Sequence, residues 1–586
     1  MPPPLAPVVE VNGRPLTART NDALTSLRID LGLGLPGRAV LRFVDTGYEM
    51  ATSALFPIAA DVEVRAGGTT LLSGEVTAIA LEQGDRPAPE LVVTVDDRAC
   101  RLGRGTQNKA FTNHSHSDLV SKMASAAGLS LGGQDASVLP KTQLPYVLQA
   151  GTHLAMLQEI CARAGLVWWV QGKQLKIAAA GAGSGTATLR LGTPDLTSFS
   201  VRATATGPEK VEVRGWNPDQ QAAITGTYET KRTKESEFVA SAAGRKAATG
   251  VTTAVALAAD RPLDAAEADT LAKARFAEAA SASVVATGTG VVAPALTLTT
   301  AVTVDNAGPA SGTYRLSRIE HTYNRSGFTT RFTAGPVRPS GLVDLLGGSR
   351  PSAGLDVPGV HPAVVSDVKD PDNKGRVKVT WKVVDDLVES AWGRIVTLGA
   401  GKSRGMVLFP EVGDEVLVAF EHGDSRRPVV LGGLYSTKNT LPSADTLDQD
   451  KVKFRRITSR LGHVVELADG TSPAEQHVLI TLEGKKDKIR LGKDQVDVVS
   501  DGTPIKLTNG QASITLAKNG DVTIEGNNIE LKAKSEIKLT ATSKVTVKGN
   551  AGVAVQGAQV QVKADGVGSV EASGPLTLKG ATVAIN

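Results

Sequence analysis

Apolar and polar positions alternate along most of residues 1–100 and again along 195–335. In runs such as Ser26–Leu31 and Ala39–Val44 the character changes from residue to residue, and Gly and Pro turns separate the runs. A period of two residues predicts antiparallel strands with one buried face. We therefore expect β-barrel modules in this part of the chain.

Helical spacing replaces the alternation in two places. Between about residues 105 and 180, Asn113 or Ser115 can cap one helix and Thr152 can cap a second. A long Ala-rich segment, Asp264–Ala282, carries acidic residues first and basic residues later, which suits the helix dipole. The pattern predicts a small α/β insert within a β-rich region.

A Gly-, Pro- and Ser-rich linker at 346–358 separates this N-terminal region, residues 1–345, from a compact block at 359–436. The block holds five short strand patterns, punctuated by Gly-Asp turns, in fewer than 80 residues. That size and strand number suit an OB-type barrel. A second short polar linker, 437–452, follows the barrel.

Residues 453–586 have a different periodicity. Apolar pairs recur about every eight residues from Ile529 onward, and no aromatic residue follows Phe454, so a globular core cannot form there. A ladder of two apolar side chains per repeat cannot bury itself, whereas three chains can enclose one. We predict a triple-stranded β-helix built by a homotrimer. Its predicted core residues are Ile529, Leu531, Ile537, Leu539, Val545, Val547, Val553, Val555, Val560 and Val562.

Composition narrows the functional classes. Lys and Arg number 64 and Asp and Glu 60, and a net charge of +4 on so long a chain argues against nucleic acid as the main partner. Cys100 and Cys161 are too few for a disulfide framework or a four-thiolate zinc site, and we expect both to be reduced and buried. The N-terminus lacks a signal-peptide pattern, and no stretch offers about 18 consecutive apolar residues. We expect assembly in the cytoplasm and no stable membrane insertion.

Two glycine motifs imitate nucleotide sites. Gly32–Gly37 has the spacing G-x-G-x-x-G, but Pro36 lies within it and a strand pattern follows where a helix is needed. Gly399–Ser403 imitates the end of a P-loop, but Val396 stands where the first glycine belongs, and Met406–Phe409 is predicted as a strand. Both motifs are interpreted as turns.

The histidines and carboxylates form no recognisable catalytic or metal site. His114, His116 and Asp118 lie at a helix start, and a solvent-exposed cap explains them better than a metal does. Glu411 and the acidic pair Asp414–Glu415 are expected on a water-exposed hairpin and not across a sugar-binding cleft. We therefore predict no catalytic residue, no metal ligand and no cofactor.

Two sets of sequence blocks carry a family resemblance: Pro371–Val379, Ala391–Arg394, Pro410–Val418 and Pro428–Tyr435 in the barrel, and Phe111–Asn113, Ser117–Val120, Leu157–Trp169 and Val213–Trp216 upstream. The first set resembles the barrel of VgrG and phage baseplate V spike proteins. The second set resembles the phage late-control D, or tail-hub, family. Together they cover nearly the whole chain, and the barrel is most similar to those of spikes of extracellular contractile injection systems.

The resemblance implies a non-enzymatic central spike and baseplate hub of a contractile injection system, a phage tail-like particle. The hub would present duplicated barrels from three subunits as a pseudo-sixfold ring, which matches a threefold needle to a sixfold inner tube. On sheath contraction the spike would pierce the target envelope and deliver cargo. Implied partners are the inner tube protein, baseplate wedge and other hub proteins, effector cargo and a PAAR-type tip protein. The particle would be released from the cell or fired into a target cell.

The C-terminal end is the predicted docking point of the tip protein, through Val583, Ile585 and Asn586. Some self-pointed spikes of the family end in a His-x-His that holds an ion, whereas the last histidine here is His477. Some phage spikes carry a lysozyme domain after the barrel, where this chain has only the short polar linker. We therefore expect a separate tip protein and cargo that is carried non-covalently.

Two other classes stay open, a receptor-binding tail fibre and a β-helical polysaccharide-degrading enzyme. A fibre needs a globular or aromatic-rich distal tip, and such an enzyme needs catalytic carboxylates in an aromatic-lined groove. The repeats and the last segment, Leu576–Asn586, offer neither. A fibre would bind cells and an enzyme would cleave polysaccharide, whereas a spike would do neither and would co-purify with tube and sheath proteins.

Overall fold

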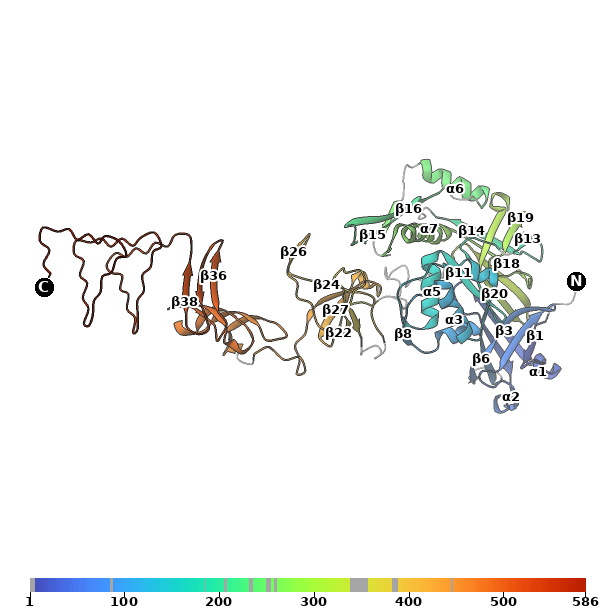
Figure 1. Cartoon of the computed structure of the whole chain (residues 1–586). Coiled ribbons are helices and arrows are strands. Elements are labelled where there is room, and N and C mark those ends of the chain that lie inside the picture. Colours follow the sequence, from blue (N-terminus) through green and yellow to red (C-terminus); the bar gives the residue numbers. More distant parts are fainter. Residues whose placement is uncertain are drawn as a thin grey trace. The chain divides into compact units, whose positions relative to one another are not determined.

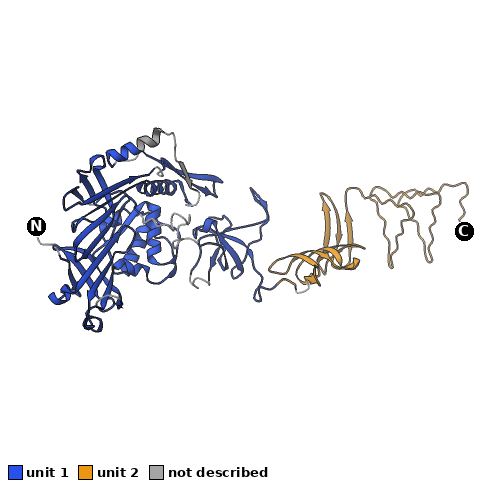
Figure 2. Cartoon of the chain, turned by 180° about the vertical axis from the view of Figure 1, so that it is seen from behind, with its two compact units in different colours: residues 1–440 blue, residues 441–586 orange. Residues whose placement is uncertain are grey.

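A computed structural model describes residues 6–84, 88–183, 185–204, 208–230, 235–248, 254–257, 261–337, 357–381, 388–443 and 446–585. The chain divides into two compact units, Met1–Thr440 and Leu441–Asn586 (Figure 2). The division falls within 437–452, the range predicted as a linker, and the finer domain bounds remain a prediction. None of the described helices is both long and apolar enough to cross a membrane.

A 13-stranded, largely antiparallel sheet dominates the described part of the first unit (Figure 1). Its main path runs β14-β18-β21-β20-β3-β4-β7-β6-β5-β1-β2, and β13 and β19 join it beside β20. The alternation predicted for Ser26–Leu31 and Ala39–Val44 is confirmed, since Leu27, Ile29 and Phe43 point into the core. The strands are β1 (Val8–Val11), β2 (Arg14–Pro15), β3 (Leu24–Gly32), β4 (Arg38–Val44), β5 (Asp61–Ala66), β6 (Thr69–Glu82), β7 (Glu90–Asp97), β13 (Thr186–Arg190), β14 (Ser198–Ala203), β18 (Val284–Val291), β19 (Ala301–Asp305), β20 (Gly312–Asn324) and β21 (Gly327–Ala334).

The α/β insert has the local structure that its sequence predicts. Ser115 caps helix α3 in a capping box with Asp118, Thr152 caps α5, and Gly165 ends α5 with φ 68°. Asn113, the alternative cap, lies before the helix. The insert also contains a short 3-10 helix, Arg98–Gly103, at its start. Its elements are β8 (Gln107–Phe111), α3 (His116–Ala126), β9 (Ser130–Leu131), α4 (Gly133–Ser137), β10 (Val147–Gly151), α5 (His153–Ala164), β11 (Leu166–Gln171) and β12 (Gln174–Ala179).

A second, smaller layer lies beside the insert. The predicted Ala-rich helix is present as α7 (Ala265–Ser281); Asp264 caps it, and it packs on strands β15 and β16. Helix α5 also contacts α7, which places the insert next to this layer. The strands of the layer are β15 (Lys210–Asn217), β16 (Ala222–Glu229) and β17 (Ala254–Leu257). The other helices of the first unit are α6 (Glu237–Ala248), which contacts the 3-10 helix Gly308–Ala310, and the short α1 (Ala18–Asp22) and α2 (Glu49–Thr52).

Gly226 on β16 sets how closely α7 approaches the sheet. A Cβ atom at this position would overlap the backbone of Ala268. We expect Gly226→Ala to destabilise the first unit by about 1–3 kcal/mol, because a backbone contact can relieve the overlap only by moving the helix. The thermal unfolding midpoint measures this effect. Gly133→Ala is the control, since its Cβ would meet no atom within 4 Å, and equal midpoints for the two variants would contradict the prediction.

The barrel segment forms a five-stranded sheet in the order β23-β22-β27-β28-β24, as the strand count predicts. A small two-stranded arm, β25 and β26, extends from it (Figure 1). Met406–Phe409, predicted as a strand, is exposed and forms no strand, because no neighbouring strand of the described chain pairs with it. The elements are β22 (Val360–Asp367), β23 (Lys378–Thr380), β24 (Arg394–Ile395), β25 (Ala400–Gly401), β26 (Arg404–Gly405), β27 (Glu415–Phe420) and β28 (Pro428–Gly433).

The second unit begins with a small hairpin and an antiparallel meander of five strands, followed by a three-stranded sheet. After β38 the described residues carry no helix or strand (Figure 1). A lone copy of this segment has no neighbour to complete its backbone hydrogen bonds, so the predicted trimeric β-helix remains a prediction. The strands are β29 (Leu447–Asp448), β30 (Lys451–Val452), β31 (Phe454–Thr458), β32 (Val464–Asp469), β33 (Gln476–Thr481), β34 (Lys488–Gly492), β35 (Val496–Val499), β36 (Ile505–Asn509), β37 (Ala512–Leu516) and β38 (Val522–Glu525).

Candidate functional site: an exposed apolar stripe and a charged joint

The five-stranded meander of the second unit exposes its apolar face. The strand register aligns nine aliphatic side chains in two rows on this face. Their exposed fractions are 36% to 67%. A contiguous apolar patch of this kind marks an interaction surface in a soluble protein. The two rows are Ile457, Val465, Ile480, Ile489 and Val498, and Leu467, Val478, Leu491 and Val496.

The opposite face of the meander is the more buried one, and it mixes apolar residues with a cluster of charged side chains. Glu466 is buried, and its carboxylate pairs with the Arg456 guanidinium and lies 3.0 Å from His477 Nε2. A chain that folds alone normally buries the apolar face of a sheet and exposes the polar face. The meander leaves its aliphatic face exposed instead, which makes this face a candidate interaction surface.

The exposed apolar surface continues along the rest of the second unit. On β36–β38 the register aligns Leu507, Ile514 and Ile524, all of them exposed. The ten predicted core residues from Ile529 to Val562 are also exposed, by 52% to 93%. We call the set from Ile457 to Ile585 the apolar stripe. The tip residues Val583 and Ile585 are exposed as well, and Asn586 lies outside the described residues.

The meander part of the stripe was missed at the sequence level. Its signal is only partial, because short runs such as Lys488–Leu491 and Val496–Val498 alternate between apolar and charged side chains whereas Val478–Ile480 is apolar throughout. Alternation alone does not say which face is buried, and the eight-residue repeat that made the ladder recognisable starts only at Ile529. The structure therefore extends the candidate surface by about 70 residues toward the barrel, while the role of the predicted core residues stays a prediction.

Within the first unit, the barrel is joined to the N-terminal region by an apolar contact. Tyr146 and Leu148, at the start of β10, belong to the same buried cluster as Trp381 and Val418 of the barrel. Tyr146 is 4% exposed and Leu148 1%. Side chains of the α/β insert thus complete the barrel core, so the barrel packs against the insert and is not a separate domain joined only by a linker.

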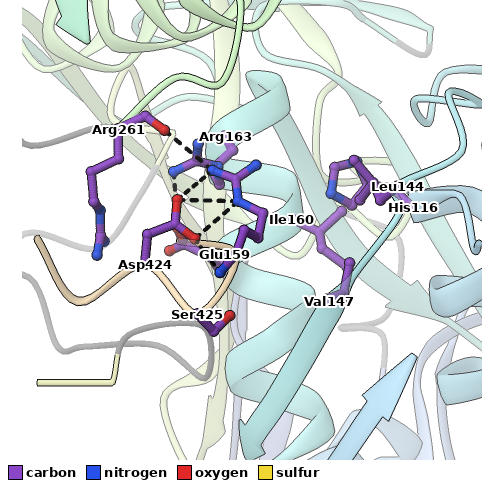
Figure 3. Close-up of a pocket in the computed structure, with 10 residues that line it drawn as sticks. His116, Leu144, Val147, Glu159, Ile160, Arg163, Arg261, Asp424 and Ser425 are labelled. Atoms are coloured by element: carbon purple, nitrogen blue, oxygen red, sulfur yellow. Dashed lines mark hydrogen bonds and ion pairs between the residues drawn. The ribbon is translucent and has the colours of Figure 1, made fainter. Parts of the chain in front are cut away.

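An ionic network surrounds this contact, and we call it the charged joint. The Arg426 guanidinium of the barrel lies 2.7 Å from Asp424 and 3.0 Å from Glu267 of helix α7. It also donates to the Arg261 carbonyl oxygen, and Arg163 of α5 approaches the same Glu267 oxygen to 2.7 Å. Figure 3 shows the loop that carries Asp424 and Ser425 facing α5. One barrel arginine thereby contacts α7 directly, and the shared Glu267 links it to Arg163 of α5.

Electrostatics keep the joint charged although it is buried. Burial by itself would raise the pKa of the Glu267 and Asp424 carboxyls, but the Arg426 guanidinium holds both pKa values below their ordinary range. The same carboxylates raise the pKa of Arg426 despite its burial. A buried charge network of this kind is costly to break from one side, because the remaining charges stay out of water without a partner.

Further contacts surround the charged joint. Arg427 donates to the carbonyl oxygens of Trp216, at 2.8 Å, and Pro262, at 2.9 Å. Lys374 pairs with Asp219 at 2.8 Å, although both side chains are largely exposed. Sequence reasoning missed the whole joint, because its barrel residues are more than 150 positions from their partners in the N-terminal region.

His114, His116 and Asp118 lie at the start of α3, as predicted, and one part of the prediction needs correction. Asp118 accepts hydrogen bonds from the Ser115 backbone and hydroxyl. His116 was expected in a solvent-exposed cap, but it is partly buried and lines a cavity with Arg163 and Arg426. The reason is tertiary, because the barrel loop covers this end of α3.

The two glycine motifs and the Glu411–Asp414 carboxylates lie in turns and loops. Gly32–Gly37 is the β3–β4 hairpin loop, with Gly34 at φ 75°, and Gly399–Ser403 lies in the β25–β26 arm. Asp414 Oδ2 accepts from the Glu411 backbone at 2.8 Å, within the turn before β27. Cys161 is buried as expected, whereas Cys100 is only partly buried.

Comparison with protein families gives two matches. Residues 32–327 match the phage tail baseplate hub (GPD) family, which is half of the chain. Residues 361–435 match the type VI secretion system/phage-baseplate injector OB domain. The two matches correspond to the N-terminal region and the barrel described above.

The curated relatives include type VI secretion system spike proteins. The chain is 29% identical over 142 residues to the type VI secretion system spike protein VgrG3 of Vibrio cholerae, covering 24% of this chain and 14% of the relative. It is 36% identical over 86 residues to the actin cross-linking toxin VgrG1 of Vibrio cholerae, covering 14% of this chain and 8% of that protein. The chain therefore spans only a small part of the curated relatives that it matches.

A solved Francisella PdpA–VgrG complex has a similar fold. The TM-score is 0.52 at 7% identity, and the match covers 84% of this chain and 88% of the other. At this identity the likeness concerns the fold alone.

Proposed function

Because the chain belongs to the phage tail baseplate hub family and combines that hub with a VgrG-like barrel, we propose that it is the central spike and hub of a contractile injection system. In this proposal three copies form a needle that pierces a target envelope when the sheath contracts. The N-terminal region adapts the threefold needle to the sixfold inner tube.

The observation that carries the proposal is the apolar stripe. It runs through every sheet of the second unit after the first hairpin and continues to Ile585, while the opposite face of the meander, with its charged cluster, is the more buried one. Two further copies of the chain supply identical stripes, and three stripes can enclose one continuous apolar core. Such a shaft has no free sheet edge, so it resists local opening under axial load.

The charged joint and the Tyr146–Leu148 contact support the mechanical part of the proposal. Force from the tube enters the N-terminal region and leaves through the needle, so it crosses the barrel. The buried joint ties the barrel to α5 and α7 and fills the barrel core from the insert. A joint of this kind can transmit axial force from the N-terminal region to the barrel without relying on the linker residues.

The proposed partners are two further copies, the inner tube protein, baseplate wedge and other hub proteins, effector cargo and a PAAR-type tip protein. The tip protein would dock at Val583, Ile585 and Asn586. The chain itself would act without catalysis, as a spike in the manner of its curated relatives, with cargo carried non-covalently. It would assemble in the cytoplasm and leave as part of the particle.

The mass of the purified full-length chain tests the proposal. We expect light scattering to give a stable assembly of about three times 60.7 kDa, since a monomer would expose the whole apolar stripe. In its native host the tagged chain should co-purify with tube and sheath proteins. A monodisperse monomer at micromolar concentration, or cleavage of polysaccharide by the purified chain, would overturn the proposal.

A further inference from the structure

A small cavity lies inside the charged joint (Figure 3). Its volume is about 20 Å³. A cavity needs about 10–15 Å³ to hold a water molecule, so this one has room for a single water. Seven of the ten lining residues are polar or charged, with His116, Glu159 and Arg163 on one side and Asp424, Ser425 and Arg426 on the barrel side.

The Ser425 hydroxyl in the wall of the cavity lacks a hydrogen-bond partner among the described residues. Ser425 is 1% exposed, so this hydroxyl is buried. A buried hydroxyl without a partner is destabilising, and most such groups in folded proteins bind an internal water. Ser425 lines the cavity, so a water held there can satisfy it.

The charges around the cavity favour water over an ion. Three guanidinium groups and three carboxylates meet here, so the cluster has no net charge while His116 is neutral. A cavity with balanced charges gives neither an anion nor a cation a reason to leave bulk solvent. The cationic groups are Arg163, Arg426 and Arg427, and the anionic groups are Glu159, Glu267 and Asp424.

His116 is the group whose titration would disturb this balance. Helix α5 presents Glu159 and Arg163 to it, α7 presents Glu267, and the barrel loop presents Arg426 and Asp424. Asp118, on its own helix, is already occupied by Ser115. Burial and then the Arg163 charge lower the pKa of His116 to about 4. A proton on the imidazole adds an unbalanced positive charge beside two guanidinium groups.

We propose that the charged joint is a hydrated lock, in which one water bound to Ser425 completes the contact between barrel and insert, and that protonation of His116 opens it. The lock holds at neutral pH and loosens as the pH falls below about 6.5, where an exposed histidine would gain its proton. Acid would then free the barrel from the insert before either part unfolds. The proposal does not depend on trimer formation.

The test follows hydrogen exchange in the full-length chain, corrected for the intrinsic pH dependence of exchange. We expect the peptides that contain β10 and residues 421–428 to exchange about tenfold faster at pH 4.5 than at pH 7.5. His116→Gln, which cannot be charged, should lose this acid response, and His116→Lys should show it already at pH 7.5. His114→Gln is the matched control, because His114 lies two residues away outside the cavity.

Several outcomes would overturn the proposal. An acid response in His116→Gln equal to that of the wild type would show that His116 is not the trigger. If His116→Gln fails to fold by circular dichroism, the wild type still decides, since opening that comes only together with global unfolding contradicts the lock. A high-resolution electron-density map with no density beside Ser425 Oγ would contradict the proposed water. Density that grows stronger with added chloride would show that an anion binds there instead of water.

Discussion

An aspartate at position 547 is expected to abolish assembly of the needle. Val547 is 69% exposed in the single chain and is one of the predicted ladder residues. In a trimer, Val547→Asp would bring three carboxylates together near the axis. Burying one unpaired charge costs several kcal/mol, and three like charges in contact add repulsion. Light scattering should therefore give about 60.7 kDa, the mass of one chain.

The neighbouring Thr546→Asp is the matched control. It introduces the same charge one residue away, and alternation along an extended segment places position 546 on the polar outer side. This variant should keep the mass of the wild type. Equal masses for the two variants would contradict the predicted register of the ladder, and an intact Val547→Asp trimer would contradict the apolar core itself.

The meander part of the stripe allows a second, independent pair of variants. Ile480 lies on the exposed apolar face and Thr458 on the opposite side of the same sheet. Ile480→Asp should shift the mass toward the monomer at low concentration, and Thr458→Asp should not. A trimer that tolerates Ile480→Asp but not Val547→Asp would confine the shared core to the ladder.

Loss of Arg426 is the second change with a large expected effect. Arg426→Ala would leave the buried Asp424 without its guanidinium partner and the partly buried Glu267 with Arg163 as its remaining ionic partner. Removing one side of a buried charge network typically costs about 3–5 kcal/mol. We expect a lower urea midpoint for the first unit and faster amide exchange in β10, whose start packs in the barrel core.

Arg404→Ala is the control for this prediction. Arg404 lies on the exposed β25–β26 arm, and a surface substitution of this kind changes stability by about 0.5 kcal/mol or less. The double variant Arg426→Ala with Glu267→Gln measures the coupling between the two groups. A loss below about 1 kcal/mol for Arg426→Ala, or no coupling, would show that the barrel is held by its apolar contact alone.

Local features of this chain were predictable because they depend on neighbouring residues. Ser115, Thr152 and Asp264 each accept a hydrogen bond from a backbone amide in the first turn of their own helix. Each helix start is therefore determined by residues within four positions of the cap. The alternation in β3 and β4 likewise reports a buried face whatever strand lies next to it. The Met406–Phe409 prediction was wrong for the complementary reason, since a strand also needs a partner.

The sequence by itself determined the elements, the five strands of the barrel and the eight-residue ladder, because periodicity and caps are local. The tertiary structure alone decided three things. It paired β20 with β3, nearly 300 residues apart, it closed the barrel core with Tyr146 and Leu148, and it gathered Arg163, Glu267 and Arg426. Each of these contacts joins segments far apart in the chain. Periodicity and helix caps depend on neighbouring residues, so they do not identify which distant residue makes the contact. The exposure of the meander's aliphatic face is likewise a tertiary feature, because alternation along a strand does not say which face is covered.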